Sequence, residues 1–582
     1  MTPEKKPEYD HIQGTKFLWQ FKKPDLDIIR EISTTHNISL PVAHTLFSRG
    51  YTDHEKIRSF LFTSFEQDVS PGHILKGAEL ATQRIIQAIH NKEKILIFGD
   101  YDVDGVTSTS VMLLSLLPLG ANINYFLPHR KRDGYGLSSK IVKKAAENEY
   151  TLLITVDNGI AAHEAANDAR ALGIDLIITD HHQPHGELPP ALSIVNPHQH
   201  DCPYPFKYFA GVGVIFKLMA MIYEQLNKQL PDKIYELLLL GTVADVVPLT
   251  GENRYWVRHG LQKINKQQSF ALSVLAQNSN LTKEIFSSLD IGFMITPQIN
   301  ALGRLDDPRE AVKFLISSDH EEVKRIGLIL QQMNEERKKV ERKIYESIEN
   351  AIINNSINLA QEKVIIAGHR EWPAGVIGLV AGKLMHAYGR PTLLFHLSSD
   401  GIAKGSCRSI PEFDMFNALT NCHDLLIKFG GHPAAAGLSL NEKNIGLLKE
   451  RLEHLVEKQL SPDDLQAKIN LDATLELADA NKKLFDDMAY LEPFGNKNPQ
   501  PIFLIKNVTL LNAPQLLKDR HVKCSFFSDG IIKPTIFFNR PDIYHVLSQA
   551  GDKSFHLAGQ VIKNEWQGNT SIELQGLDIA VL

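Results

Sequence analysis

Short apolar runs alternate with helical stretches between about residues 94 and 249. Helical patterns cover 111–117 and follow Leu137 and Ala161. Apolar runs that alternate with helices are typical of a parallel sheet that helices cover on both faces. The pattern therefore predicts an α/β domain. Its expected strands are KILIF (94–98), INYFL (123–127), LLITV (152–156), LIIT (176–179) and LSIV (192–195).

The rest of the chain divides into segments of different pattern. A stretch without proline, 319–355, predicts one long helix, and the runs KVIIAG and TLLFH predict the strands of a second α/β unit. From about Pro501, five strand patterns enclose one helical stretch between the third and the fourth, which is the order of an OB-fold barrel. We therefore expect five parts: a helical leader (1–70), a parallel-sheet domain (71–315), a connecting helix (316–355), a second α/β domain (356–460) and a C-terminal OB-fold β-barrel (461–582).

Composition narrows the class of protein. The 582 residues are 43% hydrophobic and 22% charged, as in a soluble globular protein of several domains. The net charge of −6 argues against coating nucleic acid by bulk electrostatics, although a local basic groove is compatible with it. No run of about 18 apolar residues and no signal peptide is present, so we expect a cytoplasmic protein without a membrane anchor. Four scattered cysteines without a CxxC pair support neither a zinc knuckle nor a disulfide framework.

Acidic residues follow the first strand of the predicted parallel sheet. In ILIFGDYDVDG the strand ends in Asp100, Asp102 and Asp104, where open α/β sheets bind their ligands. Three neighbouring carboxylates repel one another unless a cation neutralises them, and Mg²⁺ and Mn²⁺ prefer oxygen donors. An EF-hand loop also spaces acids at alternate positions, but no Glu stands at the twelfth position here.

Further candidate ligands follow the next strands. Asp157 ends LLITV, the triplet Asp-His-His at 180–182 ends LIIT, and Asp245 follows an apolar helix or strand with no basic partner nearby in sequence. A buried acid without a partner is costly, and imidazole favours Mn²⁺ over Mg²⁺. These residues predict a divalent-cation site. The chain has no GxSxG, HExxH or Walker-type motif that would support another catalytic mechanism.

Two other features leave alternatives open. The charge run ERKKVERK in the long helix is either a solvated face or a phosphate contact, and we favour the solvated face. The aromatic residues of the predicted barrel either stack on nucleic-acid bases or form its core. These residues are Phe526, Phe527, Phe537, Phe538 and Trp566.

The acidic motifs resemble those of the DHH phosphoesterase superfamily in order and spacing. The matching segments are 100–104, the Asp-Asn-Gly turn at 157–159, the triplet at 180–182 and Asp245. Within the superfamily, the chain is similar to the exonucleases that degrade single-stranded DNA from the 5′ end. The resemblance runs from about residue 70 to the C-terminus and includes the GGH motif of the DHH-associated domain at 430–432.

The resemblance implies a role for each matched residue. One cation would bind Asp100, Asp102 and Asp157, and a second would bind Asp104, Asp157, His181 and Asp245, so that Asp157 bridges the pair. Asp157 and His182 would be catalytic, with His182 near the scissile phosphate. The substrate would contact Arg130, Arg304, Ser406, Arg408 and His432. In REWPAGVIG, Pro373 stands where the family usually has a histidine, which puts one local substrate contact in doubt.

The resemblance also implies a function. We expect a monomeric, two-metal 5′-to-3′ exonuclease for single-stranded DNA, with Mn²⁺ preferred and Mg²⁺ possible. It would act in DNA repair and recombination, beside a single-strand binding protein and recombination or mismatch-repair factors. One alternative is an oligonucleotide or cyclic-dinucleotide phosphodiesterase of the same superfamily, which would not explain a C-terminal OB-fold. Another is a non-catalytic nucleic-acid scaffold, in which substituted acids or histidines are expected.

Overall fold

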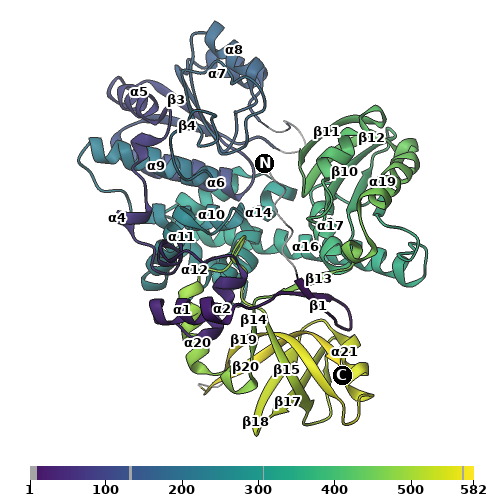
Figure 1. The fold of residues 1–582 in the computed structure, drawn as a ribbon. Coiled ribbons are helices and arrows are strands. Elements are labelled where there is room, and N and C mark those ends of the chain that lie inside the picture. The colour runs from purple at the N-terminus through teal and green to yellow at the C-terminus, as the bar shows by residue number, and fades with distance from the viewer. Residues whose placement is uncertain (1–8, 130–133, 135, 306, 567–568) are drawn as a thin grey trace. The chain divides into compact units, whose positions relative to one another are not determined.

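The computed structural model describes residues 9–129, 134, 136–305, 307–566 and 569–582 (Figure 1). The chain forms two compact units. The chain passes from one unit to the other within α16 (His320–Ile353), among other places. This helix confirms the long helix expected over 319–355. The parallel-sheet unit comprises Arg58–Glu336 and Leu491–Pro499, and the barrel-containing unit comprises Met1–Ile57, Arg337–Tyr490 and Gln500–Leu582.

The predicted parallel sheet is present, with the strand order β4-β3-β5-β6-β7 and parallel pairing throughout. The chain leaves β3 toward one edge of the sheet and returns to the other side of β3 as β5. The carboxyl ends of β3 and β5 therefore form the switch point at which open α/β sheets bind ligands. The strands are β3 (Lys94–Phe98), β4 (Asn122–Phe126), β5 (Leu152–Val156), β6 (Asp175–Thr179) and β7 (Ser193–Val195).

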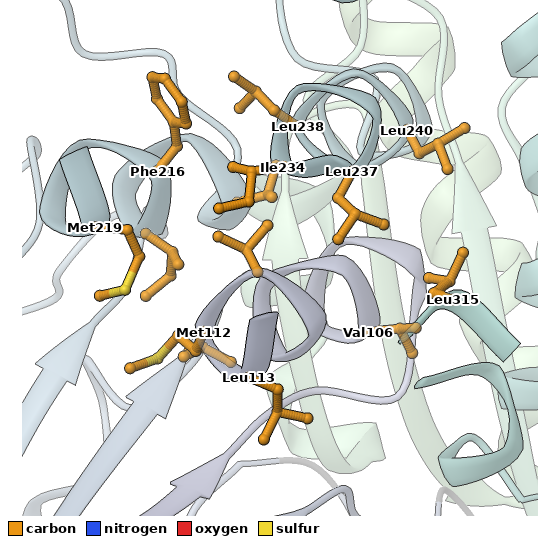
Figure 2. Close-up of a cluster of buried hydrophobic side chains, with 14 of the residues drawn as sticks. Val106, Met112, Leu113, Phe216, Met219, Ile234, Leu237, Leu238, Leu240 and Leu315 are labelled. Atoms are coloured by element: carbon orange, nitrogen blue, oxygen red, sulfur yellow. The ribbon is translucent and has the colours of Figure 1, made fainter. Parts of the chain in front are cut away.

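Helices cover both faces of this sheet because its strands are apolar on both faces. Ile95 and Ile154 join one buried cluster, whereas their neighbours Leu96 and Leu153 join another. In the first cluster, side chains of four helices gather in one buried group, with Leu113, Phe216, Leu237 and Leu315 each from a different helix (Figure 2). The helices on that face are α5 (Ala78–His90), α6 (Val103–Leu116), α9 (Gly211–Gln225) and α10 (Lys233–Ala244); those on the other are α7 (Ser139–Glu147) and α8 (His163–Ala171).

Short helices complete the parallel-sheet unit. A buried ion pair joins two of its elements, with Nζ of Lys217 in α9 lying 2.6 Å from Oε2 of Glu252 in α11.

Among the residues that the structure describes, no helix has both the length and the apolar character needed to cross a membrane. The further elements of the unit are α4 (Phe65–Asp68), α11 (Gly251–Lys266), α12 (Phe270–Asn278), α13 (Ser288–Asp290), a π-helical turn (Ile291–Ile295), α14 (Thr296–Leu305) and α15 (Arg309–Ile316).

The second α/β unit predicted near Lys363 is a five-stranded sheet of order β11-β12-β10-β9-β8. Only β8 and β9 pair in parallel. Helix α17 (Ile377–Tyr388) packs on β9 and β10, and α19 (Ile445–Gln459) contributes buried leucines to the core of this sheet. The strands are β8 (Ile365–His369), β9 (Thr392–Leu397), β10 (Ile402–Arg408), β11 (Leu426–His432) and β12 (Ala435–Asn441).

The C-terminal strands form the ring of pairings expected of an OB-fold. The pairings run from β15 through β19, β20, β18 and β17 back to β15, with one helix between the third and fourth strands. Phe526 and Phe537 are fully buried core residues, whereas Phe527 is 37% and Phe538 46% exposed. The Trp566 side chain lies outside the described residues. The elements are β15 (Phe503–Leu510), β17 (His521–Ser528), β18 (Ile531–Phe537), α21 (Pro541–Ser548), β19 (Ser554–Trp566) and β20 (Asn569–Val581).

The segment 1–70, expected to be a helical leader, contains helices, but two strands that the pattern did not predict precede them. β1 and β2 pair antiparallel, and β2 also pairs in parallel with β13, far along the chain. The five-residue runs are too short for the pattern to distinguish them from helix, and their partner strand is not local. The elements are β1 (Tyr9–Gln13), β2 (Leu18–Lys22), α1 (Leu26–His36), α2 (Leu40–Ser48), α3 (His54–Leu61) and β13 (Lys468–Leu471).

A buried carboxylate ties this N-terminal hairpin to the last strand. Asp578 in β20 has no exposed surface. It accepts hydrogen bonds from the Phe17 amide at 3.0 Å and the Trp19 indole at 3.0 Å, and it pairs with Nη2 of Arg540 at 2.9 Å. The Thr15 hydroxyl donates to it as well. A buried charge satisfied in this way is costly to disturb, because the Phe17 amide and the Trp19 indole would lose a charged acceptor.

We expect Asp578→Asn to lower the free energy of unfolding of the barrel by about 2 kcal/mol, because Arg540 would keep only Asp542 as a charged partner and the new amide nitrogen would face buried donors. Urea unfolding followed by tryptophan fluorescence measures the loss. The matched control is Asp519→Asn at an exposed barrel position, which should stay within about 0.5 kcal/mol of the parent. Equal stability of the two variants would contradict a structural role for the buried pair.

Candidate metal centre

The loop after β3 places its acids around the start of α6. Asp102 is the N-cap residue of this helix and accepts the Gly105 amide at 3.1 Å. Asp104, inside the first turn, is only 1% exposed and accepts the Gly211 amide at 2.5 Å and the Val212 amide at 2.8 Å. Those amides begin α9, so the positive end of that helix partly offsets the charge of Asp104.

Asp157, directly after β5, has a left-handed backbone with φ of 62°. This conformation is uncommon for residues other than glycine, although aspartate adopts it more often than most. The following Asn158 is buried and donates from Nδ2 to the Val156 carbonyl at 2.9 Å. The Asp-Asn-Gly turn therefore directs the Asp157 carboxylate toward the acids that follow β3.

The Asp-His-His triplet after β6 has different roles for its three members. Asp180 is buried and accepts the Ile160 amide at 2.9 Å and Nδ1 of His182 at 2.7 Å. This carboxylate thus orients His182. The ring of His181 lies against that of His182, with centroids 4.4 Å apart, and its Nε2 lies 3.1 Å from Oδ1 of Asp157.

Asp245 reaches the same place from the end of α10, whose carboxyl-terminal cap it forms. The apolar run before it is thus a helix, one of the two alternatives left open by the sequence. Nε2 of His181 lies 3.6 Å from Oδ2 of Asp245 and 3.8 Å from Oδ2 of Asp104. One imidazole nitrogen thus faces three carboxylates.

The donors form three overlapping groups in which one ligand atom per residue lies within 4.8 Å of the others. Oδ1 of Asp157 and Nε2 of His181 are buried, and neither makes a hydrogen bond within the part of the chain that the structure describes. Buried polar atoms without partners are costly, so oxygen and imidazole donors in this state fit divalent cations. The groups are Asp100, Asp102 and Asp157; Asp104, His181 and Asp245; and Asp157, His181 and His182.

The electrostatics of the cluster reflect its burial. Burial and the charge of Asp102 raise the pKa of Asp104 to about 7. Burial and the charge of Asp104 raise the pKa values of Asp157 and Asp245 well above the ordinary value. Each carboxyl group therefore favours a proton or a cation over an isolated negative charge.

The two histidines titrate in opposite directions. Burial and the neighbouring His182 lower the pKa of His181 to about 3, which keeps its imidazole neutral and able to bind a cation. Burial opposes the charge of His182 as well, but the hydrogen bond to Asp180 raises the pKa of His182 to about 9. His182 is therefore a cationic hydrogen-bond donor at neutral pH.

Sequence reasoning missed two glycines that allow the acids to come together. A Cβ at Gly211 would lie 2.7 Å from Cβ of Asp157, and a Cβ at Gly303 would lie 2.1 Å from the Tyr101 carbonyl oxygen. Only glycine fits these close approaches. The signal is indirect, since both residues stand in apolar helical stretches where glycine is unfavourable unless packing requires it.

The structure describes only some of the predicted substrate-binding residues. Arg130 and the Arg304 side chain lie outside the described residues. Arg408 and His432 occupy one row of the second sheet, because each pairs with Ala435 of β12. Residues in register project to the same face, so Arg408 and His432 share one. His432 is an exposed residue at the end of β11.

Ser406 and Arg408 adjoin the amino end of α17. Nη1 of Arg408 lies 3.3 Å from the Ser406 hydroxyl. A Cβ at Gly378 would lie 2.7 Å from Oγ of Ser406 and 3.4 Å from Nη2 of Arg408. The helix begins at Ile377, so a hydroxyl and a guanidinium lie beside its positive end. These groups suit a phosphate.

Comparison with known proteins gives the same domain content. The model of the DHH family, N-terminal domain, matches residues 94–242. The DHHA1 domain model matches 361–458, and the RecJ OB domain model matches 471–578. The three ranges contain the parallel sheet, the second sheet and the strand ring, respectively.

Curated relatives match over most of the chain. The single-stranded-DNA-specific exonuclease RecJ of Bacillus subtilis (strain 168) is 35% identical over 570 residues, which cover 98% of this chain and 71% of the relative. The protein of the same description from Escherichia coli (strain K12) is 33% identical over 526 residues, covering 87% and 90%.

Solved structures match as well. RecJ from Thermus thermophilus in complex with Mn²⁺ has a TM-score of 0.80 at 28% identity and covers 96% of this chain and 78% of that chain. The complex of the same protein with Mg²⁺ has a TM-score of 0.72 at 26% identity and covers 96% and 77%.

We expect the stability gained from Mn²⁺ to grow with pH. The pKa of Asp104 is raised in the fold, so the stability that its proton contributes is complete below about pH 4 and is lost as pH rises through about 7. Over that window the cation meets less competition from the proton. Thermal unfolding of chelated and Mn²⁺-loaded protein between about pH 5 and pH 8 measures the increment. An increment that shrinks as pH rises would contradict cation binding at these carboxyl groups, and Asp104→Asn should flatten the dependence.

Proposed function

This chain belongs to the RecJ family of single-stranded-DNA-specific exonucleases, and from that premise we propose the details of its reaction. It hydrolyses phosphodiester bonds of single-stranded DNA from the 5′ end. Two divalent cations serve the reaction, Mn²⁺ in preference to Mg²⁺. The observation that carries the proposal is the pair of donor triads at one sheet edge, Asp100, Asp102 and Asp157 beside Asp104, His181 and Asp245.

Each residue of the metal centre has its own role in the proposed reaction. Bound divalent cations would supply a water of lowered pKa and positive charge for the phosphate. Asp157 belongs to one triad, and its Oδ1 lies 3.1 Å from the imidazole of the other, so its carboxylate would serve both cation positions. His182, held by Asp180 and positively charged, donates a hydrogen bond to a phosphate oxygen. No side-chain nucleophile is required.

Residues of the second sheet bind the 5′ end of the DNA. Ser406 and Arg408, beside the positive end of α17, bind a terminal 5′ phosphate. Burial lowers the pKa of Arg408, so a phosphate there gains a partly desolvated counter-charge. Arg130, Arg304 and His432 contact the DNA backbone, an assignment that rests on the resemblance of their motifs to the family. Of the candidate aromatics whose side chains the structure describes, Phe527 and Phe538 are exposed and available to stack on bases.

Family membership also supports a cellular setting. We propose that the protein acts as a cytoplasmic monomer in DNA repair and recombination, beside a single-strand binding protein and mismatch-repair factors. The match to the RecJ OB domain over 471–578 favours a long DNA substrate over a cyclic dinucleotide. All the acids and histidines of the motifs are present, which argues against a non-catalytic scaffold.

We expect single-stranded oligonucleotides to be shortened from the 5′ end with Mn²⁺ or Mg²⁺, and chelation to abolish the activity. Oligonucleotides labelled at either end, single-stranded or duplex, with a 5′ phosphate or a 5′ hydroxyl, report strand choice and polarity. Preferential attack on duplex DNA or from the 3′ end would refute the proposal.

We expect Asp157→Asn to reduce turnover at least about a thousandfold, because both cation positions lose a negatively charged ligand. Asparagine is the suitable change since it tolerates the left-handed backbone at this position. Single-turnover rates at saturating Mn²⁺ measure the loss. The control is Asp232→Asn, which breaks only an exposed pair with Lys263 and should keep the parent rate. Turnover near the parent value in Asp157→Asn would exclude the bridging role.

A further inference from the structure

The segment Leu491–Pro499 belongs to the parallel-sheet unit, although it is distant from the rest of that unit in sequence. Backbone carbonyls of the segment accept hydrogen bonds from the rest of the unit. Nη1 of Arg254 donates to the Leu491 carbonyl at 3.0 Å, and the Ser288 hydroxyl donates to the Phe494 carbonyl at 2.7 Å. The Leu249 amide donates to the Asn496 carbonyl at 3.0 Å. The segment is thus bonded to the loop that joins α10 to α11.

That loop begins at Asp245 and contains an unfavourable backbone conformation. Val246, the residue after the acid, has φ of 58°. A β-branched side chain disfavours the left-handed region strongly, so surrounding contacts must hold this residue there. The Val246 side chain is 63% exposed, so its own packing does little to hold it.

Asn496 supplies a contact to that residue. Its Nδ2 donates to the Val246 carbonyl at 2.6 Å, while its own carbonyl accepts the Leu249 amide. Asn496 therefore bonds both sides of the turn after Asp245. Close backbone approach makes this possible, because a Cβ at the preceding Gly495 would lie 2.6 Å from Cδ1 of Leu249.

We propose that Asn496 is a positioning residue of the metal centre. By holding Val246 in the left-handed conformation, it directs the Asp245 carboxylate toward His181 and Asp104. The inference rests on the proposed function only in taking Asp245 as a cation ligand. It gives the segment Leu491–Pro499 a part in the chemistry, although the segment contributes no ligand itself.

The position of Asn496 separates this role from a general structural one. Its side chain is exposed, and so is its hydrogen bond to Val246. Removing the side chain leaves no cavity and no buried polar group without a partner, so global stability should hardly change. The effect should instead appear in the cation affinity of the Asp245 position.

The test measures Mn²⁺ binding to the full-length, chelator-treated protein by titration calorimetry, in the absence of DNA. We expect Asn496→Ala to weaken binding about three- to tenfold, the effect of losing one hydrogen bond that holds a ligand. The thermal midpoint of the metal-free protein should stay at the parent value. The matched control is Lys497→Ala, since Lys497 is exposed and its side chain makes no hydrogen bond or ion pair with the described residues.

A second substitution tests the mechanism itself. Val246→Gly removes the strain, because glycine adopts a positive φ readily. In that background, Asn496→Ala should change Mn²⁺ affinity less than about twofold. Unchanged Mn²⁺ affinity in the single Asn496→Ala variant overturns the inference. So does a loss of Mn²⁺ affinity on Asn496→Ala that is as large in the Val246→Gly background as in the parent. Parent protein that binds no Mn²⁺ would overturn the proposed function as well, so the two failures are distinguishable.

Discussion

Mutual repulsion of buried carboxylates is the constraint on which the rest of this structure depends. Asp104, Asp157 and Asp245 meet around one imidazole nitrogen at the end of a sheet. Water is largely excluded, so each negative charge raises the proton affinity of the others. Two amides of α9 offset part of the charge of Asp104, and the hydrogen bond from His182 stabilises the separate charge of Asp180. The remaining negative charge makes the site selective for cations.

The scaffold holds these groups in unfavourable conformations at defined places. Asp157 and Val246 both have left-handed backbones, and each lies at or directly beside a donor. Strain of this kind persists only where neighbouring elements determine the geometry. Here the neighbours are β5 with its Asp-Asn-Gly turn and the segment Leu491–Pro499. A donor set fixed before the cation arrives loses little conformational freedom on binding.

The sequence predicts the sheets, and the convergence of the acids and histidines at one place, for a physical reason. Buried parallel strands are continuous apolar runs, so the residue after each run is placed at the switch point without further information. The hairpin β1–β2 was missed because short strands with distant partners have no local signature. Asp245 was found, but its helix was not distinguished from a strand. The glycines at 211 and 303 and the carbonyl contacts of Leu491–Pro499 were missed because close backbone approach leaves little trace in side-chain pattern.

The attachment of Leu491–Pro499 to the loop after Asp245 also sets an order of events during synthesis. Every candidate ligand leaves the ribosome well before residue 491 does. A nascent chain therefore carries the complete donor set while the Val246 carbonyl still lacks its hydrogen bond from Asn496. The loop after Asp245 therefore gains these hydrogen bonds only when most of the polypeptide has been made.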